Sequence, residues 1–126
     1  MSGFSNYLAN QIINDTLVTP YASRFLALFV ADPTDANITA NEVSAPWYSR
    51  KGTGAWASPT VGETDNLGSI QFDPVTGAQV AISHWGIYDA ATSGNLLYNG
   101  AFATPKTFNV DDFTVVSPGD LTISLL

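Results

Sequence analysis

Cysteine is absent from the sequence, and histidine occurs once, at His84. Without cysteine the chain has no disulfide, no thiolate nucleophile and no cysteine-ligated zinc. His84 lacks a nearby partner for catalysis, because Asp89 points to the opposite face of the same predicted strand and no G-x-S-x-G motif supplies a serine. We therefore interpret His84 as a sheet residue hydrogen-bonded to a neighbour, and we predict a protein that is not an enzyme, with no catalytic residue and no cofactor.

Charge is also scarce. Charged side chains make up 12% of the residues, about half the usual share, and the formal net charge is −7. The basic residues are Arg24, Arg50, Lys51 and Lys106. They leave no basic stripe that could neutralise phosphates, so we expect no nucleic-acid partner. A surface so poor in charge is typical of a protein that assembles with other chains, because charged residues are depleted at interface cores.

Long hydrophobic runs are missing too. The opening MSGFSNYLAN lacks the basic and apolar regions of a signal peptide, and no segment approaches the ~20 apolar residues of a transmembrane helix. We expect a soluble protein with no membrane partner and no Sec export signal. Its 126 residues fit one domain, residues 1–126, with residues 1–20 as an N-terminal helix or arm and residues 24–126 as a β-sandwich.

Helical periodicity is present near the start of the chain. Residues 5–17 place apolar side chains at helical spacing, Ser5 can cap the first turn, and Thr19-Pro20 opposes continuation. The predicted apolar stripe consists of Phe4, Leu8, Ile12 and Leu17, with Ile13 one residue off it. The pattern predicts one short amphipathic helix that packs against the rest of the fold, while an extended arm remains the alternative.

The remaining periodicity is that of β-strands. RFLALFVA, residues 24–31, is apolar on both faces, which predicts a central strand with a partner sheet on one face and the helix on the other. The polar residues 32–42 follow it as a loop. SIQF, residues 69–72, predicts a short strand, and residues 79–89 form a predicted hairpin with NLLYNGAF, residues 95–102.

The end of the chain repeats this pattern. Phe113 and Val115 lead into the turn Ser117-Pro118-Gly119-Asp120, after which Leu121, Ile123 and Leu125 alternate with polar residues. This pattern predicts a second hairpin. The predicted fold class is therefore mainly β, an antiparallel β-sandwich or barrel with one short N-terminal helix.

Residues 43–61 concentrate aromatic side chains among prolines and glycines. Lys51-Gly52 is predicted to be a turn between two short strands. Trp47, Tyr48 and Trp56 are residue types that anchor interfaces, stack on sugars or fill the end of a small core. The sequence leaves these three roles open.

Acidic residues gather in predicted loops, where their oxygen atoms could hold calcium. The groups are Asp32, Asp35 and Glu42, then Glu63 and Asp65, then Asp111 and Asp112. None of them matches the spacing of an EF-hand. We therefore interpret them as solvated turn carboxylates and predict no metal site.

These segments together resemble a family of small tailed-bacteriophage virion proteins that are labelled tail-fibre or head-decoration proteins. The stretches that carry the resemblance occur in this order: GFSNYLANQIIND, FLALFVADPTDA, NEVS, HWGIYDAATSGNLLYNGAF, TPKTFN and SPGDLTISL. The resemblance implies a structural protein of the phage particle without an active site. Residues 45–61 and 73–79 depart from the family's pattern, so their surface is not carried over.

The resemblance leaves head and tail open, and three features of the sequence favour the head. The chain lacks the long repeat or coiled coil of a fibre shaft, and its acidity suits the outside of a capsid better than contact with packaged DNA. Short strands and aromatic anchors suit a clip between capsomers. We expect a decoration or cement protein on the outer capsid surface, which stabilises the assembled shell by binding only that state. The alternative is a tail-fibre or tail-tip protein that binds a host receptor or glycan.

The expected partners are the major capsid protein, or tail proteins, of the same phage. We also expect a homo-oligomer, with a trimer as one arrangement. The candidate interface residues are Trp47, Tyr48, Arg50, Lys51 and Trp56, with Phe4 and Tyr7 added if the first segment is an arm.

Overall fold

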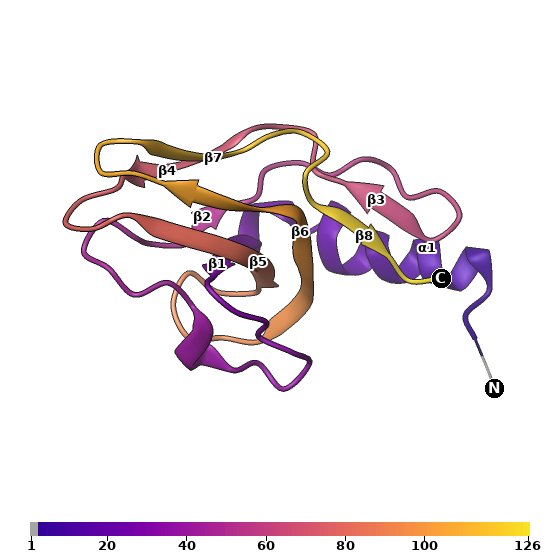
Figure 1. Ribbon diagram of the computed structural model, residues 1–126. Helices are drawn as coiled ribbons and strands as arrows, with labels where there is room; N and C mark the ends of the chain where they lie inside the picture. Colours follow the sequence, from indigo (N-terminus) through magenta and orange to yellow (C-terminus); the bar gives the residue numbers. More distant parts are fainter. Residues whose placement is uncertain (1–2) are drawn as a thin grey trace.

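A computed structural model describes residues 3–126, so the first two residues of the predicted N-terminal segment lie outside the description. The fold is mainly β, with antiparallel sheets and a short N-terminal helix, as the sequence predicts (Figure 1). The helical elements are α1 (Asn6–Ile13), the π-helical η1 (Asn14–Val18) and the 3₁₀ turns η2 (Tyr21–Ser23) and η3 (Thr39–Asn41). The strands are β1 (Phe25–Phe29), β2 (Lys51–Gly52), β3 (Glu63–Asp65), β4 (Ile70–Pro74), β5 (Val80–Tyr88), β6 (Leu96–Phe108), β7 (Phe113–Val116) and β8 (Thr122–Ser124).

The N-terminal segment is a packed helix in the described residues. Ser5 caps α1 by accepting a hydrogen bond from the Leu8 amide at 3.1 Å, as its position predicts. The buried side chains of α1 and η1 are Ala9, Ile13 and Leu17, so Leu17 of the predicted stripe is buried, whereas Phe4 and Leu8 are exposed and Ile12 is partly buried. The stripe was misplaced because Ala9, small but apolar, gave a weaker signal than Leu8. Among the described residues, no helix is long and apolar enough to cross a membrane.

Strand β1 is the second strand of a four-stranded sheet with the order β2-β1-β5-β6. Its centre is buried on both faces, as predicted, although Val30 just after it is exposed. On one face Leu26 and Leu28 join the main core together with Ile13 of the helix and Phe72 of β4. The helix and the small sheets therefore cover the same face, and their predicted placement on opposite faces is wrong.

The other face of β1 has a second, smaller core. Ala27 and Phe29 pack there with Tyr88, and the Phe29 and Tyr88 rings are stacked with centroids 6.5 Å apart. The Tyr88 hydroxyl donates a hydrogen bond to Asn37, so the polar loop after β1 folds back over this face. A loop can cover this face because the cluster has only three buried residues, Ala27, Phe29 and Tyr88.

Lys51 and Gly52 form the edge strand β2, paired with Leu26 and Phe25 of β1. The predicted turn at this position is therefore wrong. A two-residue strand is too short to show an alternating pattern, and its partner lies far back in the sequence.

Strands β5 and β6 form the predicted hairpin, and β6 continues to Phe108, beyond its predicted end. The register shifts between Ile82 and His84. This irregularity lets Ile82 share the main core with Trp85 and Ile87, although strict alternation would place them on opposite faces. Strict alternation along residues 79–89 would also put Ile82 and His84 on one face, and the register shift between them breaks that pattern.

The two strands of the predicted C-terminal hairpin do not pair with each other, so this prediction is wrong. The turn forms, since the Asp120 amide donates to the Ser117 carbonyl at 3.1 Å, but β7 pairs with β4 whereas β8 pairs with β3. Buried Asn66 holds the crossing: its Nδ2 donates to the Ser117 carbonyl at 3.0 Å, and its Oδ1 accepts from the Leu121 amide at 3.0 Å. The inward residues of β7 are Thr114 and Val116, whereas Phe113 is exposed and Val115 is partly buried.

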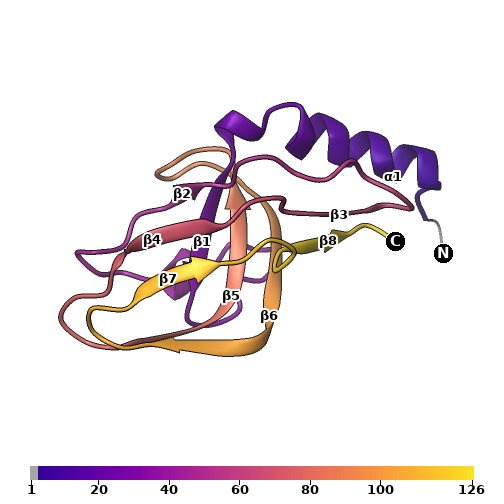
Figure 2. The ribbon, with the colours of Figure 1, turned by 90° about the horizontal axis from the view of Figure 1, so that it is seen from above.

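The two small sheets lie at different ends of the molecule. The β4-β7 pair covers the four-stranded sheet, while β3-β8 runs beside α1, so that segments from both ends of the described chain meet (Figure 2). The Gly62 amide before β3 donates to Asn10 Oδ1 of α1 at 2.8 Å, and the Gly62 carbonyl accepts from the Leu125 amide at 2.9 Å. Gly62 thus fastens the helix and the segment after β8 to one point.

Candidate functional site

The tryptophans of the aromatic segment lie in the core. Trp56 is 3% exposed, and its indole N–H donates to Thr53 Oγ1 at 3.1 Å. Trp47 is also buried and packs edge-on against Tyr48, with ring centroids 5.9 Å apart. Of the roles left open by the sequence, core filling is the one that this burial favours for both indoles, because neither offers a free face to a partner.

Tyr48 and Arg50 belong to a buried polar network centred on Glu42. Arg50 forms a bidentate ion pair with Glu42, in which Nε and Nη2 each lie 2.9 Å from a carboxylate oxygen. The Tyr48 hydroxyl donates to the same carboxylate and accepts a hydrogen bond from the Leu28 amide at 3.1 Å. Burial, the hydrogen bond to Glu42 and the Glu42 charge raise the pKa of Tyr48. The network joins the end of the loop after β1 to the segment before β2.

The other predicted polar candidates are dispersed. Lys51 makes a surface ion pair with Asp73 at 3.2 Å. His84 Nδ1 lies 2.7 Å from Ser83 Oγ, which confirms a sheet histidine hydrogen-bonded to a neighbour. In the part of the chain that the structure describes, no group of three or more histidine, aspartate or glutamate residues is placed to hold a metal ion.

Phe4 and Tyr7 are the predicted interface residues whose side chains are exposed, at 49% and 76%. They lie one helical turn apart at the start of α1, and Leu8 extends the same outward face. Exposed Leu126 lies beside Ala9 on the packed side of α1, since a Cβ atom added to Gly62 would meet Leu126 at 2.8 Å and Ala9 at 3.1 Å, and exposed Val61 precedes Gly62 in the chain. We call this surface the apolar end, and it consists of Phe4, Tyr7, Leu8, Val61 and Leu126.

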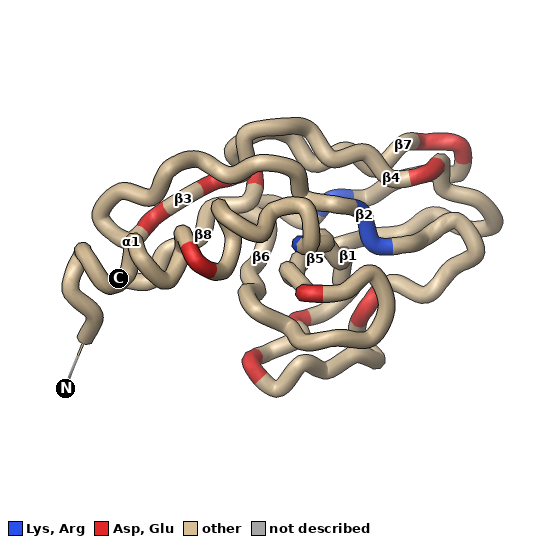
Figure 3. The backbone as a smooth tube through the Cα atoms, turned by 180° about the vertical axis from the view of Figure 1, so that it is seen from behind, with Lys and Arg blue, Asp and Glu red and all other residues tan. Residues whose placement is uncertain are grey.

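The apolar end includes a hollow of about 540 Å³ that is lined by Gly3, Phe4, Leu125 and Leu126. Helix α1 carries no charged residue, and in Figure 3 it has neither of the charge colours. The nearest acidic side chains in sequence are Asp15 and Glu63. An exposed aromatic pair next to a hollow whose lining residues have no charged side chain has the composition of a protein interface.

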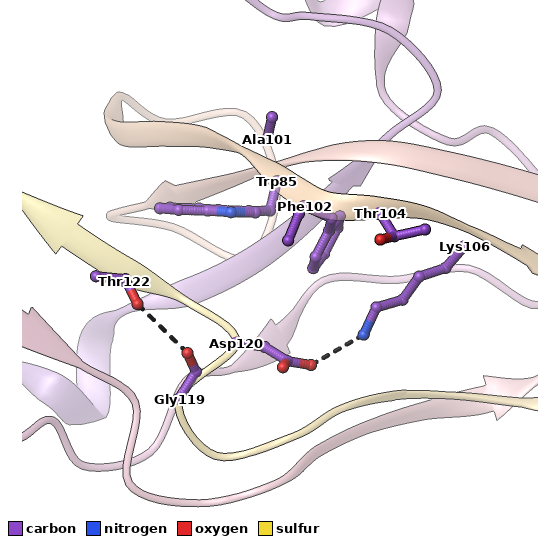
Figure 4. A pocket seen from close by; sticks show the side chains of 9 residues that line it. Trp85, Ala101, Phe102, Thr104, Lys106, Gly119, Asp120 and Thr122 are labelled. Atoms are coloured by element: carbon purple, nitrogen blue, oxygen red, sulfur yellow. Dashed lines mark hydrogen bonds and ion pairs between the residues drawn. The ribbon is translucent and has the colours of Figure 1, made fainter.

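A second hollow lies between β6 and the 117–122 turn, with a volume of about 460 Å³ (Figure 4). Trp85 and Phe102 form its buried floor. Gly100 permits this floor, because a Cβ there would lie 2.6 Å from Trp85 Cζ2. The polar rim consists of Thr104, Lys106, Asp120 and Thr122. We call this site the rim pocket.

An ion pair between Lys106 of β6 and Asp120 of the 117–122 turn connects the two sides of the rim pocket. Lys106 Nζ lies 2.9 Å from Asp120 Oδ2, which also accepts a hydrogen bond from the Ser117 amide at 2.9 Å. Burial opposes ionisation of Asp120, but the hydrogen bond from Lys106, the bond from Ser117 and the Lys106 charge hold its pKa below the usual value. Lys106 also lies 5.2 Å from the centre of the Phe102 ring. Charge and hydroxyl groups over an aromatic floor can bind a polar ligand with one apolar face.

Sequence reasoning missed the rim pocket entirely. Thr104 and Lys106 were placed after the end of the hairpin, and Asp120 was placed in a turn of another hairpin. Residues 103–108, ATPKTF, do not alternate between apolar and polar side chains, and Pro105 argues against a continuing strand. No local signal indicates that the two segments meet.

Comparison with known protein families shows that the family described as podophage GP4 fiber I protein gp80 matches residues 3–124. A search among curated proteins finds no match.

Proposed function

Because the chain belongs to the family of podophage GP4 fiber I protein gp80, we propose that it is a structural component of the phage tail fibre. The family makes it a phage virion structural protein, and the match extends over nearly the whole described chain. The single observation that carries the tail location is this family description. It supports the alternative raised by the sequence better than the decoration of the capsid.

The geometry is compatible with a fibre that is built from compact units. A β-rich body with an uncharged apolar end can be added to a larger assembly without forming a shaft of its own. The lack of a coiled coil, which favoured the head, therefore does not oppose a tail location.

Localisation on the particle tests this proposal. Gold-labelled antibodies against the purified protein are applied to intact virions of the phage that encodes it, and the labelled positions are scored by electron microscopy. In parallel, the protein is co-sedimented with emptied heads and with isolated tails, and copies bound per particle are counted. Label and binding confined to tails support the proposal. Many copies on heads and none on tails would overturn it and restore the decoration hypothesis.

A second candidate function is the binding of a host glycan, and the rim pocket favours it. Sugars bind where polar groups can hydrogen-bond their hydroxyls, and the rim of this pocket carries Thr104, Lys106 and Asp120 above its buried apolar floor. The sequence leaves open that Trp47 and Trp56 bind sugars. In this second candidate function the rim pocket binds the sugar instead, because both tryptophans are buried.

Saccharide titration tests the second candidate. Host-cell polysaccharide fragments are added to the protein while tryptophan fluorescence is recorded, since Trp85 lines the pocket. The matched variants are Lys106→Ala in the pocket and Lys51→Ala outside it, because both lysines form surface ion pairs. A saturable shift that is lost in the first variant alone supports binding. Equal responses of both variants would exclude this pocket.

A further inference from the structure

We propose that the free edge of β6, from Asn99 to Ala101, docks an extended basic segment of a different virion protein. The segment adds to the four-stranded sheet as a new edge strand and places a tyrosine-sized side chain in the rim pocket. This inference goes beyond the tail location, because it concerns a partner chain and the contact that holds it. It gives the rim pocket to a peptide, whereas the second candidate function gives the same pocket to a sugar.

Strand β6 has a partner on one side only. In the sheet order β2-β1-β5-β6 it is an outermost strand, and it pairs with β5 (Figure 2). Within residues 3–126, no backbone group of β6 makes a hydrogen bond outside that pairing, either to the backbone or to a side chain. A strand with such an edge is a template for pairing with another chain.

Hydrogen bonding on β1 fixes the direction of the backbone groups on β5. The Leu28 amide donates to the Tyr48 hydroxyl at 3.1 Å, and the Leu28 carbonyl accepts from the Val43 amide at 2.9 Å. Both groups of Leu28 therefore point away from β5. In an antiparallel pair the residue opposite also points its groups away, so Trp85, the partner of Leu28, directs its own groups to β6.

The same alternation identifies the groups at the free edge. Trp85 pairs with Gly100, so Gly100 directs its amide and carbonyl to β5. Asn99 and Ala101, on either side of Gly100, then direct theirs outward, and the register from Tyr98 to Ala101 is regular. Each of the two outward residues can exchange a pair of hydrogen bonds with an added antiparallel strand.

The features that usually keep an edge strand from pairing lie in the other half of β6. Pro105 has no amide hydrogen, and Lys106 is charged. The run LLYNGAF, residues 96–102, contains neither proline nor a charged residue. The stretch that is open to strand addition is therefore the first half of β6.

The rim pocket adjoins this stretch, since Ala101 and Phe102 are among its lining residues. Trp85 and Phe102 lie on one side of β6, whereas Ala101 points to the opposite side (Figure 4). Side chains of an added strand alternate in the same way, so the residue opposite Gly100 points to the side of the pocket. A hollow of about 460 Å³ with an apolar floor and a polar rim suits a tyrosine at that position.

Charge on the opposite side of the strand favours a basic segment. Asn99 points there, and its Nδ2 donates to the exposed Asp35 carboxylate at 3.2 Å. The two residues that flank the tyrosine of the added strand lie on that side as well. The net charge of −7 also attracts a basic chain at longer range. We therefore expect basic residues on both sides of the tyrosine.

Amide hydrogen exchange of the full chain, followed by NMR, tests the free edge first. The amides of Asn99 and Ala101 should exchange at least about tenfold faster than those of Tyr98 and Gly100, which are bonded to β5. Equal protection of all four amides would overturn the proposal, because the edge would then be covered. Protection that grows with protein concentration would do the same, since another copy would occupy the edge.

Peptide titration tests the docking. The probe is an acetylated and amidated peptide, Thr-Val-Lys-Tyr-Lys-Val-Thr, which carries the expected alternation. We expect a dissociation constant of about 10–500 µM, with slower exchange of the Asn99 and Ala101 amides in the complex. One control peptide has glycine in place of tyrosine, and the other has N-methyl groups on the backbone nitrogens of both lysines. Each should bind at least about tenfold more weakly, because one lacks the pocket residue and the other lacks the donors.

Variants of the protein test the same contact from the other side. Ala101→Pro removes an outward amide and keeps the bonds to β5, whereas Ala101→Ser retains the amide as the matched control. Asp35→Asn removes the charge beside the edge, and Asp111→Asn removes an exposed charge in the turn after β6. We expect at least about tenfold weaker peptide binding for Ala101→Pro and about threefold for Asp35→Asn, with both controls close to the wild type.

Thermal unfolding checks that each variant folds, and the N-methylated peptide gives the same test if Ala101→Pro does not. Absence of saturable binding up to about 1 mM, or equal binding of the N-methylated peptide, would overturn the proposal. Polysaccharide fragments that bind the rim pocket where the peptide does not would give the pocket to a sugar. Because the isolated chain and a synthetic peptide are measured, failure here leaves the location on the tail untouched.

Discussion

The guanidinium carbon of Arg50 lies 3.6 Å from the centre of the Tyr88 ring. The same guanidinium pairs with Glu42 and donates to the carbonyl oxygens of Ala90 at 3.2 Å and Ser93 at 2.7 Å. One cation therefore joins the end of the loop after β1, the segment before β2 and the turn of the β5-β6 hairpin. Cation–π attraction and charge-assisted hydrogen bonds reinforce one another in this partly dehydrated position.

Glu42→Gln should destabilise the fold by about 3 kcal/mol, because it leaves the mostly buried Arg50 charge without a countercharge. Asp73→Asn, which removes the partner of Lys51 in an exposed pair, should cost only about 0.5 kcal/mol. Urea unfolding of the two variants and the wild type measures both free energies. Similar losses of unfolding free energy in the two variants would show that burial does not make the Glu42–Arg50 pair more stabilising than the exposed Lys51–Asp73 pair.

Ile13→Ala should destabilise the fold by about 3 kcal/mol, since it removes a fully buried side chain of α1 and leaves a cavity. Ile12→Ala, one residue earlier and only partly buried, should cost less than about 1 kcal/mol. Thermal unfolding compares them. If neither variant is destabilised, α1 does not pack on the core and behaves as an arm.

Gly100→Ala should cost about 2 kcal/mol, because the added methyl group collides with the Trp85 indole. Gly68→Ala is the matched control, as a Cβ at Gly68 meets nothing within 4 Å, and its effect should stay within about 0.5 kcal/mol. Tryptophan fluorescence should also change in the first variant, because the indole must shift. An unchanged spectrum and stability would contradict the close approach of the two residues.

Asp120 should make stability depend on pH. Its pKa is lowered in the folded state, so its contribution is present above the unfolded pKa of about 3.9 and is lost as the pH falls through the lower folded value. Because the pair with Lys106 is partly solvated, that contribution should be about 0.5 kcal/mol. Urea unfolding at neutral pH and near pH 3 measures it for the wild type, Asp120→Asn and Lys106→Met. The difference between the wild type and either variant should be largest at neutral pH, and a difference that grows on acidification would contradict this sign.

The parts of the fold that could be predicted from sequence are those determined by nearby residues. The Ser5 cap and the β5-β6 hairpin depend on contacts within a short stretch, and both are present. The pairing of β7 with β4 and of β8 with β3 could not be predicted, because the choice of partner is made by distant residues such as Asn66. A single bulge near His84 was enough to change which side chains share a face.

The same limit applies to the candidate site. Composition singled out Trp47 and Trp56 as possible anchors, but it could not tell an exposed indole from a buried one. Phe4 and Tyr7 were identified for their residue type, and their exposure depends on which face of α1 packs. The rim pocket is formed by β6 together with the 117–122 turn, so the sequence of neither segment alone predicts it.

The two backbone hydrogen bonds of Gly62, one to α1 and one to the segment after β8, make the apolar end depend on contacts between distant segments. The apolar end combines α1, the turn before β3 and the residues after β8, and it exists only when these distant segments have met. Contacts between residues far apart in sequence form slowly, because the chain loses entropy when it closes the loop, before the contacts themselves can stabilise it. A partly folded chain would lack the complete surface, so a contact through the apolar end would be open only to molecules that have finished folding.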